Sequence, residues 1–212
     1  MNDTADQGFT IALFGGGFDP PHKGHVAFCR ALARSGLFDK VWVLPTYKHP
    51  FGKGAAPFAD RLEMCRLAFS SLSDNIEVRD DESCVGCEGY TVELIRWLQK
   101  RYPQHRFSLA LGSDNYEVRT RWKDFDEIER LVDVRFFGRK GWEELNRKLH
   151  IPAPFPRVSS EEIRDAIAEG KMPVNKLPRA VAGYIKKKGL YKEPGGLKKR
   201  TATDCRGPET GS

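Results

Sequence analysis

Short β-rich runs alternate with amphipathic helical patterns along the first 137 residues, and this alternation restricts the fold more than any other feature. The runs predicted to be strands are Phe9–Phe14, Val41–Leu44, Ile76–Val78, Phe107–Leu111 and Val134–Phe137. Apolar residues at three- and four-residue spacing predict helices over Gly24–Ser35, Ala59–Leu72, Thr91–Tyr102 and Phe125–Leu131. Such alternation is typical of a parallel sheet with helices on both faces, so the sequence predicts an α/β fold.

Beyond residue 156 the pattern changes to helices alone. Ser159 and Glu162 stand at the spacing of a capping box, which predicts a helix that begins there and runs to about Ala168. A last helix is predicted over about Pro178–Lys188, where Gly189 supplies the stop.

The chain has 212 residues, of which 40% are hydrophobic and 30% charged, and this suits one globular domain. We expect that domain to span residues 8–192, with a C-terminal helical part at about 157–192 and a mobile basic tail at 193–212. The net charge of +6 equals the excess of seven basic residues over one acidic residue between Lys186 and Arg200. This location favours a helix end and a solvated tail over a nucleic-acid-binding face.

The sequence also restricts the compartment and the metal chemistry. No apolar run approaches the roughly 18 residues of a membrane span, and the first eight residues do not resemble a signal peptide, so we expect a cytoplasmic protein without a membrane partner. The sequence leaves a homo-oligomer open. Cys84 and Cys87 form a C-x-x-C pair with no second pair at zinc-like spacing, which favours ordinary core or loop thiols, and no metal site of the chain's own is predicted.

The most informative segment, LFGGGFDPPHKGH at residues 13–25, joins the first predicted strand to the first helix. Its three glycines let a ligand come close to the backbone, and the helix that follows begins near a proline, an arrangement suited to a phosphate or a nucleotide. The segment lacks the G-x-x-x-x-G-K-[ST] string of a P-loop. It also fails the dinucleotide fingerprint, because Pro20 replaces the third glycine.

His22 and His25 stand three residues apart at the predicted helix start, so their side chains project to the same side near the positive end of the helix dipole. Two histidines without a carboxylate or thiol at a fitting spacing make a poor zinc site. A structural role, with one of them as a helix cap, is the other alternative. Their position directly after a glycine loop favours binding of phosphate oxygens.

The string GGGFDPPHKGH resembles the H-x-G-H signature of the nucleotidyltransferase superfamily, and specifically the bacterial nicotinate mononucleotide adenylyltransferases, which usually read G-G-[TS]-F-[DN]-P-x-H-x-G-H. Further segments that resemble this family are PTYKHPFGK at 45–53, DRLEM at 60–64, Tyr90-Thr91, Gly112-Ser113-Asp114 with Trp122, VSSEEIR at 158–164 and the ending from Leu177 to Tyr191. The resemblance covers about residues 8–192. It implies a Rossmann-like nucleotidyltransferase fold and the transfer of AMP from ATP to nicotinate mononucleotide in NAD biosynthesis, with Mg²⁺ carried by ATP.

The resemblance also implies roles for individual residues. Backbone N–H groups of the glycine loop would hold phosphate oxygens, His22 and His25 would donate to the α- and β-phosphates, and Arg164 would bind the β- and γ-phosphates. Tyr90 and Thr91 would receive the nicotinate carboxylate at a helix N-terminus, and Trp122 would stack on the pyridine ring. The other candidates for ATP binding are Gly15, Gly16, Gly17, Phe18, Gly112, Asp114 (for a ribose hydroxyl), Ser159 and Ser160, with Lys53 and Arg139 of lower rank.

Ordinary structural roles compete with several of these assignments. Arg164 could be a solvated surface residue, Ser159 and Asp114 could be helix caps, and Trp122 could belong to the core.

Two departures from the family pattern bear on the activity. Gly17 stands where the family usually has Thr or Ser, and Glu161 stands where its second signature carries Thr. We expect activity to survive both, with ATP affinity somewhat weakened and the Glu161 side chain turned to solvent. The alternatives left open are an adenylyltransferase for nicotinamide mononucleotide or phosphopantetheine, and a non-catalytic nucleotide-binding protein of the same fold.

Overall fold

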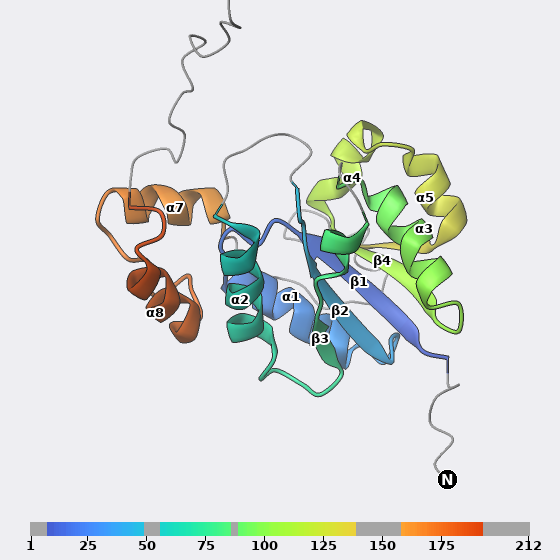
Figure 1. Ribbon diagram of the computed structural model, residues 1–212, viewed down its shortest axis with the longest axis horizontal. Coiled ribbons are helices and arrows are strands. Elements are labelled where there is room, and N and C mark those ends of the chain that lie inside the picture. Colours follow the sequence, from blue (N-terminus) through green and yellow to red (C-terminus); the bar gives the residue numbers. More distant parts are fainter. Residues whose placement is uncertain (1–7, 49–55, 86–88, 139–157, 193–212) are drawn as a thin grey trace, which may run out of the picture.

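A computed structural model describes residues 8–48, 56–85, 89–138 and 158–192 (Figure 1). The predictions for Lys53, Cys87, Arg139 and the tail at 193–212 lie outside these residues. Within the described part of the chain, no helix has both the length and the apolar character needed to cross a membrane.

Five parallel strands form one sheet in the order β3-β2-β1-β4-β5, which confirms the predicted α/β class. The strands are β1 (Thr10–Gly16), β2 (Lys40–Pro45), β3 (Ile76–Val78), β4 (Arg106–Gly112) and β5 (Asp133–Phe137). The chain moves outward from β1 through β2 to β3, then crosses to the other side of β1 for β4 and β5. This reversal next to β1 opens a crevice at the carboxyl ends of the strands, where open α/β sheets bind their ligands.

Alternate residues of β1 point into two separate cores, one on each face of the sheet. Ala12 and Phe14 join a core that contains residues of α1 (Lys23–Arg34) and α2 (Phe58–Phe69). Ile11 and Leu13 join the opposite core, under α3 (Thr91–Arg101) and α5 (Phe125–Leu131). Because β1 is buried on both faces, its sequence is a continuous apolar run.

Both C-terminal helices are present, α7 (Ser160–Ala168) and α8 (Arg179–Lys188), and both contribute to the core of α1 and α2 (Figure 1). The predicted capping box is only half formed. The Ser159 hydroxyl accepts from the Glu161 N–H at 3.1 Å, but the Glu162 carboxylate binds Lys176 Nζ at 2.8 Å. A bond to the lysine ammonium is charge-assisted and therefore stronger than a bond to a neutral N–H.

Three short helical elements follow no periodic pattern and were not predicted. They are the 3₁₀ turn η1 (Asp81–Cys84), the helix α4 (Asp114–Val118) and the 3₁₀ turn η2 (Arg119–Arg121). Cys29 and Cys65 are fully buried in α1 and α2, whereas Cys84 is exposed.

Candidate functional site

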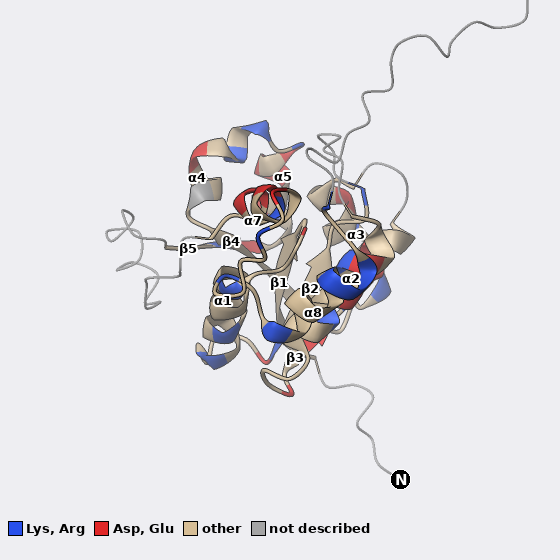
Figure 2. Ribbon diagram, turned by 90° about the vertical axis from the view of Figure 1, so that its left-hand side faces the viewer, with Lys and Arg blue, Asp and Glu red and all other residues tan. Residues whose placement is uncertain are grey.

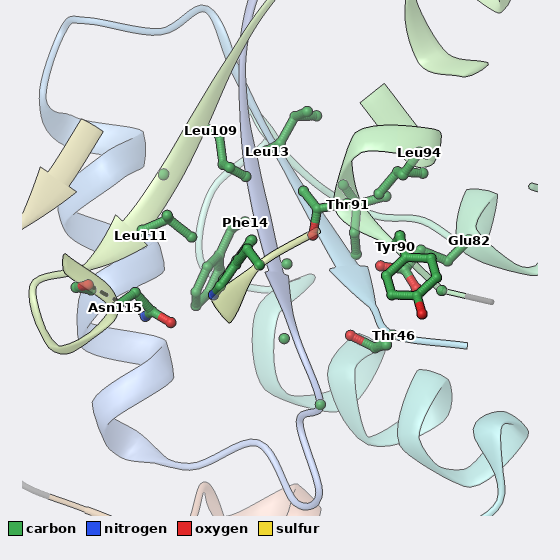
Figure 3. Close-up of a pocket in the computed structure, with 18 of the residues that line it drawn as sticks. Leu13, Phe14, Thr46, Glu82, Tyr90, Thr91, Leu94, Leu109, Leu111 and Asn115 are labelled. Carbon is green, nitrogen blue, oxygen red and sulfur yellow. Dashed lines mark hydrogen bonds between the residues drawn. The ribbon is translucent and has the colours of Figure 1, made fainter. Parts of the chain in front are cut away.

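A cavity of about 700 Å³ opens at the carboxyl ends of β1, β2 and β4, in the crevice that the strand order creates (Figure 3). Its floor is apolar, and its rim carries the glycine loop on one side and the start of α3 on the other. Eight of the candidate residues line it: Gly15, Gly16, Gly17, His25, Tyr90, Thr91, Gly112 and Trp122.

The glycine loop presents backbone to this cavity. A Cβ atom at Gly15 or Gly17 would meet nothing within 4 Å, whereas one at Gly16 would lie 3.2 Å from the Phe18 ring. Phe18 itself has a positive φ of 45° and is only 2% exposed, so its ring is a core anchor and only its backbone belongs to the loop surface. The loop is thus anchored by the Phe18 ring on its buried side, while its other side lines the cavity.

His22 and His25 cap each other at the start of α1. His22 Nδ1 accepts from the His25 N–H at 3.2 Å, and His25 Nδ1 accepts from the His22 N–H at 3.3 Å. The rings are stacked, with centroids 3.6 Å apart. Because each Nδ1 is an acceptor, each neutral ring carries its proton on Nε2. The capping role and a phosphate-binding role therefore use different nitrogens of the same ring.

A buried guanidinium supports the loop from α2. Arg61 is 4% exposed, and it donates to the carbonyl oxygens of Gly17 at 2.9 Å, Ala56 at 3.0 Å and Tyr47 at 3.3 Å. Burial lowers the pKa of Arg61, and the nearby Asp19 carboxylate opposes this shift. Five donors in a planar fork suit Arg for this task. Although Arg61 lies in the DRLEM segment, no role was predicted for it, because its partners are main-chain oxygens from three separate segments.

The start of α7 lies against the segment that follows the glycine loop. Ser160 Oγ donates to the Pro20 carbonyl at 3.0 Å, and Arg164 Nη1 donates to the Asp19 carbonyl at 2.7 Å. Among the candidates, His22, Arg164, Ser159 and Ser160 do not line the cavity, and His22 is buried. Arg164 and Ser160 contact the segment that follows the glycine loop. Glu161 is exposed, as predicted.

The acceptor candidates lie across the cavity from the glycine loop. Tyr90 is the N-cap of α3 without a side-chain cap, and Lys123 Nζ lies 4.1 Å from the centre of its ring. Trp122 is partly buried, with its ring edge-on to Phe125. Gly89 brings α3 close to the end of β2, because a Cβ atom there would lie 2.3 Å from the Lys48 carbonyl oxygen.

Asp114, the candidate ribose-binding residue, is the first residue of α4, and Ser113 is the N-cap of that helix. The adjacent Asn115 lines the cavity, and its amide donates to the Gly112 carbonyl at 3.3 Å (Figure 3).

One acidic residue in the cavity was missed. Glu82 lies in η1, and its Oε2 accepts from the Tyr47 N–H at 2.9 Å. Burial raises the pKa of Glu82 to about 7, although the Tyr47 hydrogen bond and the Arg61 charge lower it. Figure 3 shows it beside Tyr90, above Thr46. A lone Glu in an aperiodic segment carries no sequence signal of its own.

Comparisons with known proteins agree with this geometry. The sequence model described as cytidylyltransferase-like matches residues 13–166. A protein of Anaeromyxobacter sp. (strain K), named "probable nicotinate-nucleotide adenylyltransferase", is 39% identical over 87% of this chain and 98% of its own. A protein of the same name from Myxococcus xanthus is 35% identical over 85% of this chain and 94% of its own. The chain belongs to the nicotinate-nucleotide adenylyltransferase family.

Solved structures support the same fold for this adenylyltransferase family member. Two structures of the Plasmodium falciparum nicotinic acid mononucleotide adenylyltransferase, one complexed with APC and one with NaAD, are similar to this chain with TM-scores of 0.70 and 0.69. Each has 20% sequence identity and covers 86% of this chain and 97% of its own. The Rossmann-like nucleotidyltransferase fold predicted from the sequence is therefore confirmed.

Proposed function

We propose that the chain transfers AMP from ATP to nicotinate mononucleotide, with nicotinate adenine dinucleotide and pyrophosphate as products. We also propose that this reaction takes place in the cytoplasm and belongs to NAD biosynthesis. The observation that carries it is the position of the glycine loop and His25, on which His22 is stacked, on one rim of the cavity and of the start of α3 on the other.

The proposed reaction forms one bond and breaks one. An oxygen of the acceptor's 5′-phosphate attacks the α-phosphorus of ATP, and the bond from that phosphorus to the bridging oxygen breaks, so that pyrophosphate leaves with the electron pair. The attacking phosphate is already ionised at neutral pH and needs no general base. The site must supply alignment of two anions and positive charge around the transferred group.

The phosphate side of the cavity is proposed to meet this need. Backbone N–H groups at Gly16, Gly17 and Phe18 would hold phosphate oxygens, and the Nε2–H groups of His22 and His25 would donate to the α- and β-phosphates. Arg164 would reach the β- and γ-phosphates from α7, which requires its guanidinium to exchange the Asp19 carbonyl for a phosphate oxygen.

The acceptor side is proposed to hold the pyridine. The N-terminus of α3 at Tyr90 and Thr91 suits the nicotinate carboxylate because unpaired N–H groups and the helix dipole favour an anion there. Trp122 would stack on the ring, and Asp114 would accept from a ribose hydroxyl. Lys53 and Arg139, which lie outside the described residues, are proposed as further sources of positive charge for phosphate binding.

Magnesium is proposed to enter as part of the MgATP substrate, where it neutralises the pyrophosphate. Across the described ranges, no three His, Cys, Asp or Glu side chains gather into a metal-binding group.

Pyrophosphate release tests the proposal directly. The chain is incubated with MgATP and, in separate reactions, nicotinate mononucleotide, nicotinamide mononucleotide or phosphopantetheine, with an acceptor-free reaction as control. We expect clear preference for the nicotinate acceptor, with the dinucleotide product identified by mass. Preference for another acceptor would reassign the substrate, and release with none of the three would contradict the enzymatic function.

A further inference from the structure

The Asp19 carboxylate joins segments from opposite ends of the sequence directly beneath the glycine loop. Its Oδ1 accepts from the Ala56 N–H at 3.0 Å and from the Tyr191 hydroxyl at 2.7 Å. Its Oδ2 lies 3.5 Å from Arg164 Nη1. Asp19 is 8% exposed, so these contacts form with little competition from water.

Tyr191 reaches this carboxylate from beyond the end of α8. Gly189 ends that helix in the left-handed conformation, and Tyr191 itself has a φ of 62°, so the chain turns back toward the loop. The contact joins residues 172 positions apart. Figure 1 shows α7 and α8 on the side of the molecule that carries α1 and α2, away from α3 and α5, and Figure 2 looks onto that side.

The Tyr191 hydroxyl shares the Asp19 carboxylate with nearby positive charges. Two guanidinium groups, those of Arg61 and Arg164, lie near one carboxylate. Arg164 Nη1 is closer to the Asp19 main-chain oxygen, at 2.7 Å, than to its carboxylate. Burial and the Asp19 charge raise the pKa of Tyr191, so the phenol keeps its proton and remains a donor to Oδ1.

We propose that Tyr191 is a positioning residue for ATP: its hydroxyl holds the Asp19 carboxylate so that Arg164 remains available to the ATP phosphates and the glycine loop keeps its shape. This inference rests on the proposed function. Without the hydroxyl, Oδ1 loses one of its two donors, and the carboxylate becomes a stronger partner for Arg164. The guanidinium is then held against the protein when ATP binds.

The structure contains a matched control for this contact. Tyr184, in α8, donates its hydroxyl to Asp60 Oδ1 in α2, also at 2.7 Å. Tyr184→Phe therefore removes the same type of bond from the same packed region, without touching Asp19 or Arg164.

Steady-state kinetics with MgATP and nicotinate mononucleotide separate the two variants. For Tyr191→Phe we expect KM for MgATP to rise about tenfold, the effect of losing one hydrogen bond to a charged group, with KM for the acceptor within about twofold of its original value. For Tyr184→Phe we expect both KM values to stay unchanged. Melting temperatures of both variants report folding. Equal MgATP KM values for the two variants, or a matched rise in acceptor KM, would overturn the proposal.

A double-mutant cycle tests whether Asp19 transmits the effect. Asp19→Asn removes the charge that attracts Arg164 but keeps an oxygen for Ala56 and Tyr191, so adding Tyr191→Phe to it should change KM for MgATP by less than about twofold. A full tenfold effect in that background would overturn the proposed route.

The same variants separate this inference from the proposed function. If the original chain binds MgATP but releases no pyrophosphate with any acceptor, the proposed function fails, and MgATP titration calorimetry on both tyrosine variants still decides the role of Tyr191. A chain that does not bind MgATP would overturn both.

Discussion

The two rims of the cavity are built by different means. The phosphate rim is a single loop held by hydrogen bonds from α2, α7 and the segment after α8, and two of its supporting charges, Asp19 and Arg61, are buried. The acceptor rim is assembled from short elements, η1, η2 and the start of α3, with ring contacts and partly exposed side chains. Under the proposed function, the first arrangement would fix backbone N–H groups for a constant ligand group, the triphosphate, whereas the second would leave side chains to select an acceptor.

The stacked histidines allow the sharpest test of the phosphate rim. Asn is among the best N-cap residues, so His22→Asn should keep α1 capped while removing the imidazole Nε2. We expect kcat/KM for MgATP to fall about 100- to 1,000-fold, as when an enzyme loses one preorganised donor. The free energy of unfolding, measured by urea denaturation, should change by less than about 1 kcal/mol. Lower stability with normal turnover would assign His22 to structure alone.

Glu82, on the acceptor rim, is expected to make the free energy of unfolding depend on pH. Burial raises the pKa of Glu82 to about 7 from 4.5, so the folded chain binds a proton that the unfolded chain releases. The resulting stabilisation is complete below pH 4.5 and is lost as pH rises through about 7. The loss amounts to at most about 3 kcal/mol.

The measurement for Glu82 is urea denaturation across this pH range with Glu82→Gln as the partner variant. The amide does not titrate, so its curve should lack the corresponding fall in the free energy of unfolding. Parallel curves for the two proteins would refute the assigned shift.

Trp122→Ala tests whether a change on the acceptor rim affects KM for the acceptor without affecting KM for MgATP. We expect KM for nicotinate mononucleotide to rise about tenfold, because a stacked aromatic pair contributes roughly 0.5–1.5 kcal/mol beyond its buried area, while KM for MgATP stays within about twofold. Trp97→Ala is the control, since Trp97 is also partly buried against the same core but does not line the cavity. Similar acceptor KM values in both variants would remove Trp122 from the acceptor site.

The smallest expected effect belongs to Gly17→Thr. A Cβ atom there meets nothing within 4 Å, so a side chain can start at this position without a clash. One extra hydrogen bond to a phosphate should lower KM for MgATP about threefold. Gly16→Ala is the contrast, because its Cβ would lie 3.2 Å from the Phe18 ring and should reduce the melting temperature. An increase in KM for Gly17→Thr would show that the glycine itself is needed.

The sequence predicted the sheet well because central parallel strands are buried on both faces. The apolar run of β1 and the helical spacing in α3 identify these elements, with ends within about two residues of those observed. The elements η1, α4 and η2 are too short to show a helical period of apolar residues, so their cavity-lining residues were found only in the structure. Trp122, which follows η2, was predicted from the family resemblance.

Local motifs could likewise identify His22 and His25, whose spacing at a helix start is readable along the chain. The contacts that hold the glycine loop could not be identified in this way, although Arg164 itself was a candidate from the family resemblance. Arg61 binds carbonyl oxygens of three segments, and Arg164 lies on Asp19, 145 positions away. Partners this distant depend on how the helices pack, and side-chain spacing in one helix does not reveal them.

The bond between Tyr191 and Asp19 also has a consequence for the order of events during protein synthesis. The glycine loop follows the first strand, and its strand partners β2 and β4 are made well before α8. The sheet can therefore begin to assemble while the ribosome is still translating, but Asp19 must wait for a residue 172 positions later to obtain its second donor. A nascent chain would therefore have a formed sheet before Asp19 has both of its donors, and the proposed nucleotide site would be finished only after residue 191 has been made.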